Sequence, residues 1–225
     1  MAAVVRKNAT RRGRSEDSTL TRSKLLEAAG IIFAEKGYDR ATAKEIAERA
    51  QTNAAAVNYH FGGVEALYEE ALALAHHRLV SFHSLEQTIA DDADPRDKLR
   101  HLIETLGATA AASGSASWPA RLVSREILSP TPYIRTVIER EIAPKKMLAL
   151  GIISEIIGLP IDHPDVARAG FAILAPCLML LIADRRIVEL TPALSLEGAR
   201  SKAMSDQMIA FALGGLLAIT KERVG

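Results

Sequence analysis

Residues 53–60 combine small and polar side chains in a way that suits contact with a DNA duplex. Three alanines, Ala54–Ala56, precede Asn58, Tyr59 and His60. Alanine methyls let a helix approach the floor of the major groove and contact thymine methyls, and an asparagine amide can bond an adenine edge in two places. The same residues could also be simple helix formers with one solvated asparagine. The pattern alone therefore leaves DNA binding open.

The candidate DNA contacts come from a basic N-terminal segment, the start of a short helix and the helix that follows it. Hydroxyls, ammonium groups and helix N-termini bind phosphates without reading sequence. The first 24 residues carry seven Lys or Arg and two Asp or Glu, a net +5, so the remaining chain carries −4 of the total +1. This asymmetry is typical of a chain whose basic end meets a polyanion, and also of a solvated tail. The candidates are Arg11, Arg12, Arg14, Thr42, Lys44, Thr52, Asn53, Ala54, Ala55, Asn58, Tyr59 and His60.

The sequence offers no cluster for catalysis or for metal binding. His76 and His83 lie two turns apart on a predicted helix, with His77 beside them, but no cysteine or carboxylate stands at i,i+4 spacing from these histidines. The single cysteine, Cys177, excludes a disulfide framework and a paired-cysteine zinc site. No phosphate-binding glycine loop, nucleophile elbow or HExxH motif occurs. We therefore predict that the chain is no enzyme and holds neither metal nor cofactor.

The elements that position these residues are predicted to be helices throughout. Apolar residues recur with a helical period from Thr21 onward, and no segment alternates between apolar and polar residues as a strand does. Thr42 and Glu45 have the spacing of a capping box, so a short helix follows Thr42. Asn53 is expected to cap the next helix. The predicted fold class is all-α.

Two short helices behind a longer one are the arrangement of a helix-turn-helix DNA reader. The segment from Thr21 to Leu67 resembles the N-terminal domain of the TetR family of bacterial one-component regulators. The residues that carry this resemblance are Phe33, Gly37, Tyr38, Thr42, Ile46, Ala47, the Asn58-Tyr59-His60-Phe61 box and Leu67. The run Val57–Gly63, with the proline-broken C-terminal half, is more similar to the CecR-like branch.

The resemblance implies an all-helical homodimer with two domains. It divides the chain into a basic disordered arm over 1–18, a helix-turn-helix DNA-binding domain over 19–65, and a larger helical ligand-binding and dimerisation domain over 66–225. Three positions depart from the family pattern. Gln51 replaces the usual turn glycine and predicts mild backbone strain, Val64 replaces a phosphate-binding lysine, and Asn58 replaces an aromatic residue, which suggests a different base preference.

The last two helical patterns resemble the pair that forms a four-helix bundle across the family's two-fold axis. An ordinary monomeric core is the alternative interpretation. The run from Ala169 to Ala183 is apolar nearly all round, but it is shorter than the roughly 20 residues that a bilayer requires, so we expect no membrane span. The candidate interface residues are Phe171, Leu174, Cys177, Leu178, Leu181, Met208, Phe211 and Gly215.

For a small effector, the sequence suggests a cavity around the single tryptophan, because a few polar groups in an apolar site suit a small molecule. A blander interpretation makes Trp118 a core residue, and Arg121 and Glu126 an exposed pair. The candidate ligand-binding residues are His101, Trp118, Arg121, Glu126, Tyr133 and Met147.

The sequence therefore predicts a cytoplasmic, ligand-responsive transcriptional regulator, in such families most often a repressor. Its expected partners are a palindromic double-stranded DNA operator, a second copy of the chain and a small-molecule effector that releases the DNA, with no membrane. The alternative is an effector-independent DNA-associated or protein-interaction factor on the same fold.

Overall fold

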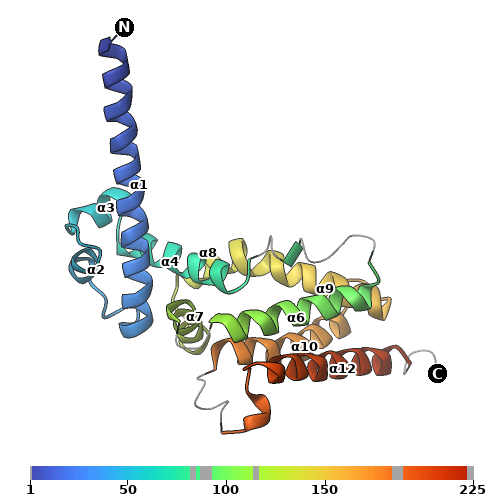
Figure 1. The fold of residues 1–225 in the computed structure, drawn as a ribbon. Coiled ribbons are helices and arrows are strands. Elements are labelled where there is room, and N and C mark those ends of the chain that lie inside the picture. The colour runs from blue at the N-terminus through green and yellow to red at the C-terminus, as the bar shows by residue number, and fades with distance from the viewer. Residues whose placement is uncertain (1, 82–84, 87–92, 114–116, 184–189, 222–225) are drawn as a thin grey trace.

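The computed structural model describes residues 2–81, 85–86, 93–113, 117–183 and 190–221. Within these ranges all regular elements are helices, as the sequence predicted (Figure 1). They are α1 (Ala2–Lys36), α2 (Ala43–Arg49), α3 (Ala55–Phe61), α4 (Val64–Leu79), α6 (Pro95–Ser113), α7 (Trp118–Leu128), α8 (Ile134–Val137), the π-helix η1 (Ile138–Ile142), α9 (Ala143–Ile157), α10 (Pro164–Ile182), the 3-10 helix η2 (Pro192–Leu194) and α12 (Ala199–Lys221).

Helix α1 begins much earlier than the sequence pattern indicated. Residues 2–18, for which we expected a disordered arm, continue the helix, and the N-terminal end of α1 projects away from the other helices (Figure 1). Alanine and arginine are strong helix formers and the segment contains no proline, so no residue there forces the helix to stop. Gly37, with φ of 80°, ends α1 in the left-handed conformation that glycine adopts freely.

Local side-chain caps fix the two short helices. The Thr42 hydroxyl accepts a hydrogen bond from the Glu45 N–H at 3.2 Å, and the Glu45 carboxylate accepts one from the Thr42 N–H at 3.3 Å. This pair confirms the predicted capping box. The next helix, α3, begins at Ala55 and not directly after Asn53. The Asn53 side chain still caps it, because its Oδ1 accepts from the Ala56 N–H at 3.1 Å.

Two hydrophobic cores divide the described residues. The first contains α1 to α4 together with α7 and α8, with Phe33, Leu67 and Leu122 fully buried in it. The second lies among α6, α9, α10 and α12. The three N-terminal helices thus complete their core with a helix that lies more than 50 residues further along the chain. The boundary predicted at residue 65 follows the DNA-binding motif but does not coincide with the boundary between the cores.

The C-terminal helices include a change of helix type and two long apolar elements. The π-helix η1 gives way to α9 at Ala143, next to Pro144, which has no N–H to donate to the helix. Helices α10 and α12 are each long and apolar enough to cross a membrane by length and composition. We expected the run Ala169–Ala183 to be too short to cross a bilayer. Helix α10 begins earlier, at Pro164, and the whole helix meets the length criterion. Each of the two helices, however, buries one side in the second core.

Candidate nucleic-acid interface and interdomain contacts

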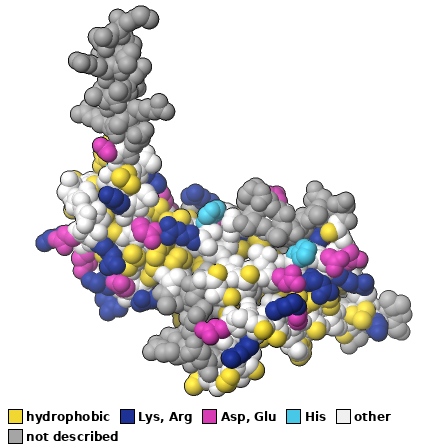
Figure 2. Space-filling view, viewed as in Figure 1, with side chains coloured by type: hydrophobic (Ala, Val, Ile, Leu, Met, Phe, Trp, Pro, Cys, Tyr) yellow, Lys and Arg dark blue, Asp and Glu magenta, His cyan; other side chains and the backbone are white. Residues whose placement is uncertain are grey.

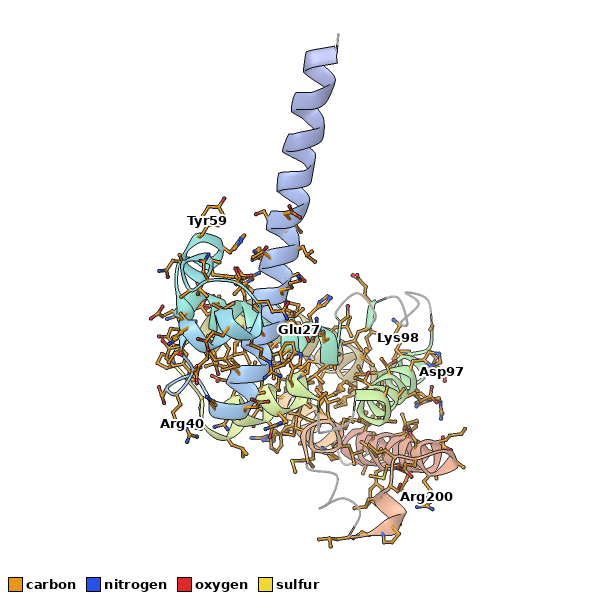
Figure 3. The ribbon with its side chains drawn as sticks, turned by 60° about the vertical axis from the view of Figure 1, so that its left-hand side comes forward. Glu27, Arg40, Tyr59, Asp97, Lys98 and Arg200 are labelled. Carbon is orange, nitrogen blue, oxygen red and sulfur yellow. The ribbon has the colours of Figure 1, made fainter. Side chains whose placement is uncertain are left out.

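Helix α3 presents the predicted base-reading residues on one exposed face. Val57 and Phe61 are buried on the opposite face and hold the helix against the first core. Ala54, Ala55 and Asn58 are exposed, and Tyr59, with 81% of its surface accessible, points away from the molecule (Figure 3). The structure therefore brings small methyls, one amide and one phenol onto a single convex surface. Their contact with DNA stays a prediction.

Gln51 holds the turn between α2 and α3 in a strained conformation. Its φ is 57°, and among the described residues it is the one non-glycine with a positive φ. Two backbone bonds close the turn behind it, from the Gln51 N–H to the Glu48 carbonyl at 3.1 Å and from the Thr52 N–H to the Ala47 carbonyl at 2.9 Å. A side chain in this region costs free energy that glycine avoids. This confirms the strain predicted from the missing turn glycine.

Basic side chains lie along α2 and in the loop before it. Lys44 is exposed and lies 3.9 Å from Glu48 of the same helix. Arg40 donates from Nε to the Lys36 carbonyl at 3.1 Å, and Arg49 is exposed at the end of α2. Lys and Arg are visible over this part of the molecule, interspersed with acidic residues (Figure 2). The sequence reasoning did not select Arg40 and Arg49, although their positions flanking a candidate DNA-contacting helix could have indicated them.

The remaining predicted DNA-contacting residues differ in exposure, and some of their side chains are not described. Thr42 is exposed at the start of α2, whereas Thr52 and His60 are half-buried. His60 packs between its neighbours, 4.9 Å from the Tyr59 ring centroid. The side chains of Arg11, Arg12 and Arg14 lie outside the described part of the structure. Their role therefore stays a prediction.

Three of the predicted effector-binding residues lie on the surface. His101 is exposed on α6, where its Nδ1 lies 3.3 Å from the Glu104 carboxylate. Arg121 is exposed on α7, and Met147 is half exposed on α9. These residues come from three different helices, and their role in effector binding stays a prediction.

Trp118 lies instead between α1, α4 and α7. Its indole N–H donates to the Glu27 carboxylate at 2.7 Å, and Arg78 Nη2 lies 2.7 Å from the other oxygen of that carboxylate. The Arg78 guanidinium also stacks over the Trp118 ring at 5.2 Å. Burial raises the pKa of Glu27, but the hydrogen bonds from Arg78 and Trp118 and the charge of Arg78 outweigh it and lower the pKa below its usual range. Glu27 is labelled in Figure 3, and its two partners come from α4 and α7.

Glu126 and Tyr133 belong to a second polar group that joins the same helices. Glu126 is only 2% exposed and accepts from Tyr68 Oη at 2.5 Å, from the Thr131 N–H at 2.7 Å and from the Thr131 hydroxyl at 2.9 Å. Tyr133 Oη lies 2.9 Å from Tyr38 Oη. Burial, followed by the bond to Glu126, raises the pKa of Tyr68 well above its usual range. These side chains are hydrogen-bonded to one another, and their role in effector binding stays a prediction.

The predicted dimer residues divide between an exposed and a buried set. Phe171 and Phe211 are 77% and 75% exposed, and Leu178 is also exposed. Cys177 and Leu181, in contrast, are buried inside the protomer, and burial raises the pKa of the Cys177 thiol to about 11. Leu174 and Met208 are half-buried, and Gly215 is exposed.

An apolar groove of about 460 Å³ runs between α10 and α12. Three predicted interface residues, Met208, Phe211 and Gly215, line it, while none of the predicted effector-binding residues does. Apart from Gln207 its lining is apolar: Ala169, Ala172, Ile173, Pro176, Leu194, Met204, Met208, Phe211, Ala212, Gly215, Leu216 and Ile219.

The histidines form no metal site in the described residues, where no group of three or more His, Cys, Asp or Glu side chains converges. His83 lies outside these residues. Burial, with a smaller effect from the charge of Lys145, lowers the pKa of His76 to about 4, so its imidazole is neutral near pH 7. Lys145 itself donates to the His76 carbonyl at 3.4 Å and pairs with Glu141 at 3.3 Å.

Two family descriptions match the chain. Residues 25–71 match "Bacterial regulatory proteins, tetR family". Residues 95–216, more than half of the chain, match "HTH-type transcriptional dual regulator CecR, C-terminal domain". The two matches cover the DNA-binding motif and most of the helices that form the second core.

The chain is also similar to individual transcriptional regulators. The chain is 30% identical over 91 residues, 40% of its length and 42% of the relative's, to the HTH-type transcriptional repressor NicS of Pseudomonas putida. It is 23% identical to the probable HTH-type transcriptional regulator YttP of Bacillus subtilis, over 64% of this chain and 70% of that one. The crystal structure of the transcriptional regulator FadR from Bacillus subtilis, in complex with stearoyl-CoA, has the same fold, with a TM-score of 0.65 at 17% identity over 86% of this chain and 98% of that one.

Proposed function

Because the chain belongs to the TetR family of transcriptional regulators, with a C-terminal domain of the CecR type, we propose that it represses transcription by binding a palindromic operator as a homodimer. The exposed face of α3 carries this proposal. Its alanines allow close approach to the bases, Asn58 is the side chain that can read an adenine, and Tyr59 can bind a phosphate. The chain is a regulator and not an enzyme.

The proposed dimer pairs α10 and α12 with the same helices of a second copy. Phe171 and Phe211 are two large aromatic side chains that the protomer leaves almost uncovered. Gly214 and Gly215 on α12 have open space where a side chain would stand, so a partner helix can approach closely there. A two-fold dimer also explains why the operator should be palindromic, since each half-site then meets one α3.

The proposed effector is a small molecule held by the C-terminal domain, and its binding lowers operator affinity. The FadR complex supports this proposal, because there a related fold contains an acyl-CoA. An effector can release the operator only by binding the DNA-incompetent state more tightly than the competent one.

The test is a selection of bound duplexes from a random-sequence pool, followed by fluorescence anisotropy on the selected DNA. We expect a palindrome, a stoichiometry of one dimer per palindrome, and affinity lost when either half-site is scrambled. Asn58→Ala should relax selection at one position per half-site, whereas the matched surface variant Glu139→Gln should not. Weak binding that is indifferent to sequence would contradict the proposal and favour the effector-independent DNA-associated factor.

A further inference from the structure

The cluster of Glu27, Arg78 and Trp118 occupies the place where the chain passes between the two cores. Arg78 is the penultimate residue of α4, the helix after which the chain leaves the first core for α6. Trp118 is the first residue of α7, the helix with which the chain returns from α6 to the first core. Glu27 of α1 binds both of them. The Glu27 carboxylate thus connects the end of α4 and the start of α7 to α1, the helix against which α2 packs.

The backbone of α1 is shaped to receive the tryptophan. Gly30 is buried one turn after Glu27, and a Cβ on it would lie 2.5 Å from the Trp118 ring. That distance is too short for any real contact, so glycine is required if the indole is to stay on α1 in this position. The ring is therefore held by α1 on one side and by the Arg78 guanidinium, 5.2 Å from its centroid, on the other.

The far end of α7 is attached to the same helix. Arg125 Nη2 donates to the Glu35 carbonyl of α1 at 3.4 Å, and a Cβ on Gly37 would lie 3.1 Å from Arg125 Nη1. With Trp118 near Glu27 and Arg125 near Glu35, α7 is anchored along α1 at two points about two turns apart. A rotation of α1 to α3 relative to α7 would have to break the Glu27 contacts and move the indole off Gly30.

We propose that Glu27 and Arg78 are positioning residues: together with Trp118 they fix the DNA-binding helices to α7 and thereby set the separation of the two α3 helices in the dimer. This inference rests on the proposed function, because it needs an operator with two half-sites. It adds the residues that hold the DNA-binding helices in a fixed orientation relative to α7. The cluster touches neither the bases nor the α10–α12 groove and acts only through orientation.

The first test compares Glu27→Gln with Glu139→Gln. Glu27→Gln removes the charge that holds Arg78, while Glu139→Gln breaks the exposed pair with Arg135, 3.3 Å apart and within one helical segment. Binding is measured on the selected palindrome and on palindromes with one base pair inserted or deleted between half-sites. We expect Glu27→Gln to lose about three- to tenfold in affinity for the native spacing, as the loss of a partly exposed charged contact would predict, and to discriminate less among spacings.

Binding to a non-palindromic duplex and the comparison of the two spacing profiles complete this test. Affinity for a non-palindromic duplex should be unchanged in both, because phosphate contacts set it. If the spacing profile of Glu27→Gln equals that of Glu139→Gln, the positioning role is refuted even though the ion pair is lost.

The second test does not depend on DNA. Trp118 is the only tryptophan in the chain, so intrinsic emission reports directly on this cluster. Glu27→Gln should shift the emission maximum and speed amide hydrogen exchange in α7, and Glu139→Gln should do neither. An unchanged emission and exchange pattern would overturn the proposed cluster. If the wild-type chain selects no palindrome while these effects occur, the regulator proposal fails and the attachment of α7 to α1 stands.

Discussion

Replacing Tyr68 by phenylalanine should destabilise the protein by removing a single buried hydrogen bond. Tyr68 is 1% exposed and its Oη lies 2.5 Å from Oε2 of Glu126, which is 2% exposed. The other carboxylate oxygen has two donors, the N–H and the hydroxyl of Thr131, so Tyr68→Phe leaves Oε2 as the under-satisfied atom. The ring itself is retained, with its edge contacts to Phe33 and Tyr38 at 4.8 and 5.1 Å between centroids.

The expected loss follows from the charge on the acceptor. A hydrogen bond to a charged group contributes about 1.5–3 kcal/mol, and here no water can replace the phenol without opening the core. The matched control is Tyr59→Phe, which removes the same hydroxyl from a side chain that is 81% exposed and should change the free energy of unfolding by less than about 0.5 kcal/mol. We expect the reverse order in DNA affinity, since Tyr59 is the proposed phosphate contact.

Urea unfolding at a fixed protomer concentration measures both variants, because the stability of a dimer depends on concentration. The double variant Tyr68→Phe/Glu126→Gln should lose less than the two single variants together, since both partners of the bond disappear at once. A Tyr68→Phe protein within about 0.5 kcal/mol of wild type, with an unchanged urea dependence, would show that the bond does not stabilise the fold.

The remaining predictions concern the turn, a histidine, the base contact and the N-terminal segment. Gln51→Gly should raise the free energy of unfolding by about 0.5–1 kcal/mol, because the relief of the left-handed strain exceeds the entropy of the added glycine; a lower urea midpoint would contradict this. The pKa of His76 falls from 6.5 to about 4 on folding, so its contribution of up to about 3 kcal/mol is complete above pH 6.5 and is lost as the pH falls toward 4. His76→Gln should flatten the difference in stability between pH 7 and 4. Asn58→Ala should cost about 1–3 kcal/mol at one operator position per half-site, whereas an equal loss on every sequence would mean that Asn58 binds only phosphate. Deleting residues 1–18 should reduce the slope of log affinity against log salt by about three, at about 0.9 per phosphate contact, and equal slopes would exclude the arm from the interface.

The features that the sequence predicted correctly depend on neighbours within a few residues. The capping box needs only Thr42 and Glu45, three positions apart. The positive φ of Gln51 was predicted from the family resemblance, where a glycine usually holds this turn, and the backbone bonds that close the turn span three and five residues. Both features are local, so the spacing of capping residues identifies the first and comparison with the family pattern identifies the second.

The placement of Trp118 could not be predicted in the same way. Its partner Glu27 is 91 residues away, and Tyr38 is 95 residues from Tyr133. Nothing in the residues around Trp118 distinguishes a cavity wall from a contact between helices, since both require an aromatic ring with a polar neighbour. Only the packing of α7 on α1 decides between the two.

The orientation of α10 was ambiguous for a different reason. The helix is apolar nearly all round, so its sequence does not show which stripe faces the protomer core. Cys177 and Leu181 face inward, while Phe171 and Leu178 remain outside. A helix that is apolar on two faces is expected to pack against two neighbours. Its sequence does not show which face packs in the protomer core, and only the tertiary structure does.

The shared first core limits how modular this regulator can be. A chimera that joined residues 19–65 of this chain to the C-terminal half of another regulator would bring Leu25 and Phe33 against a foreign α7 in place of Leu122 and Val123. It would also place Gly30 opposite whatever residue stands in the position of Trp118. Exchange of DNA specificity between relatives should therefore succeed when only the exposed residues of α3 are substituted. Exchange of the whole N-terminal domain should require α7 to be transferred with it, as a discontinuous second insert.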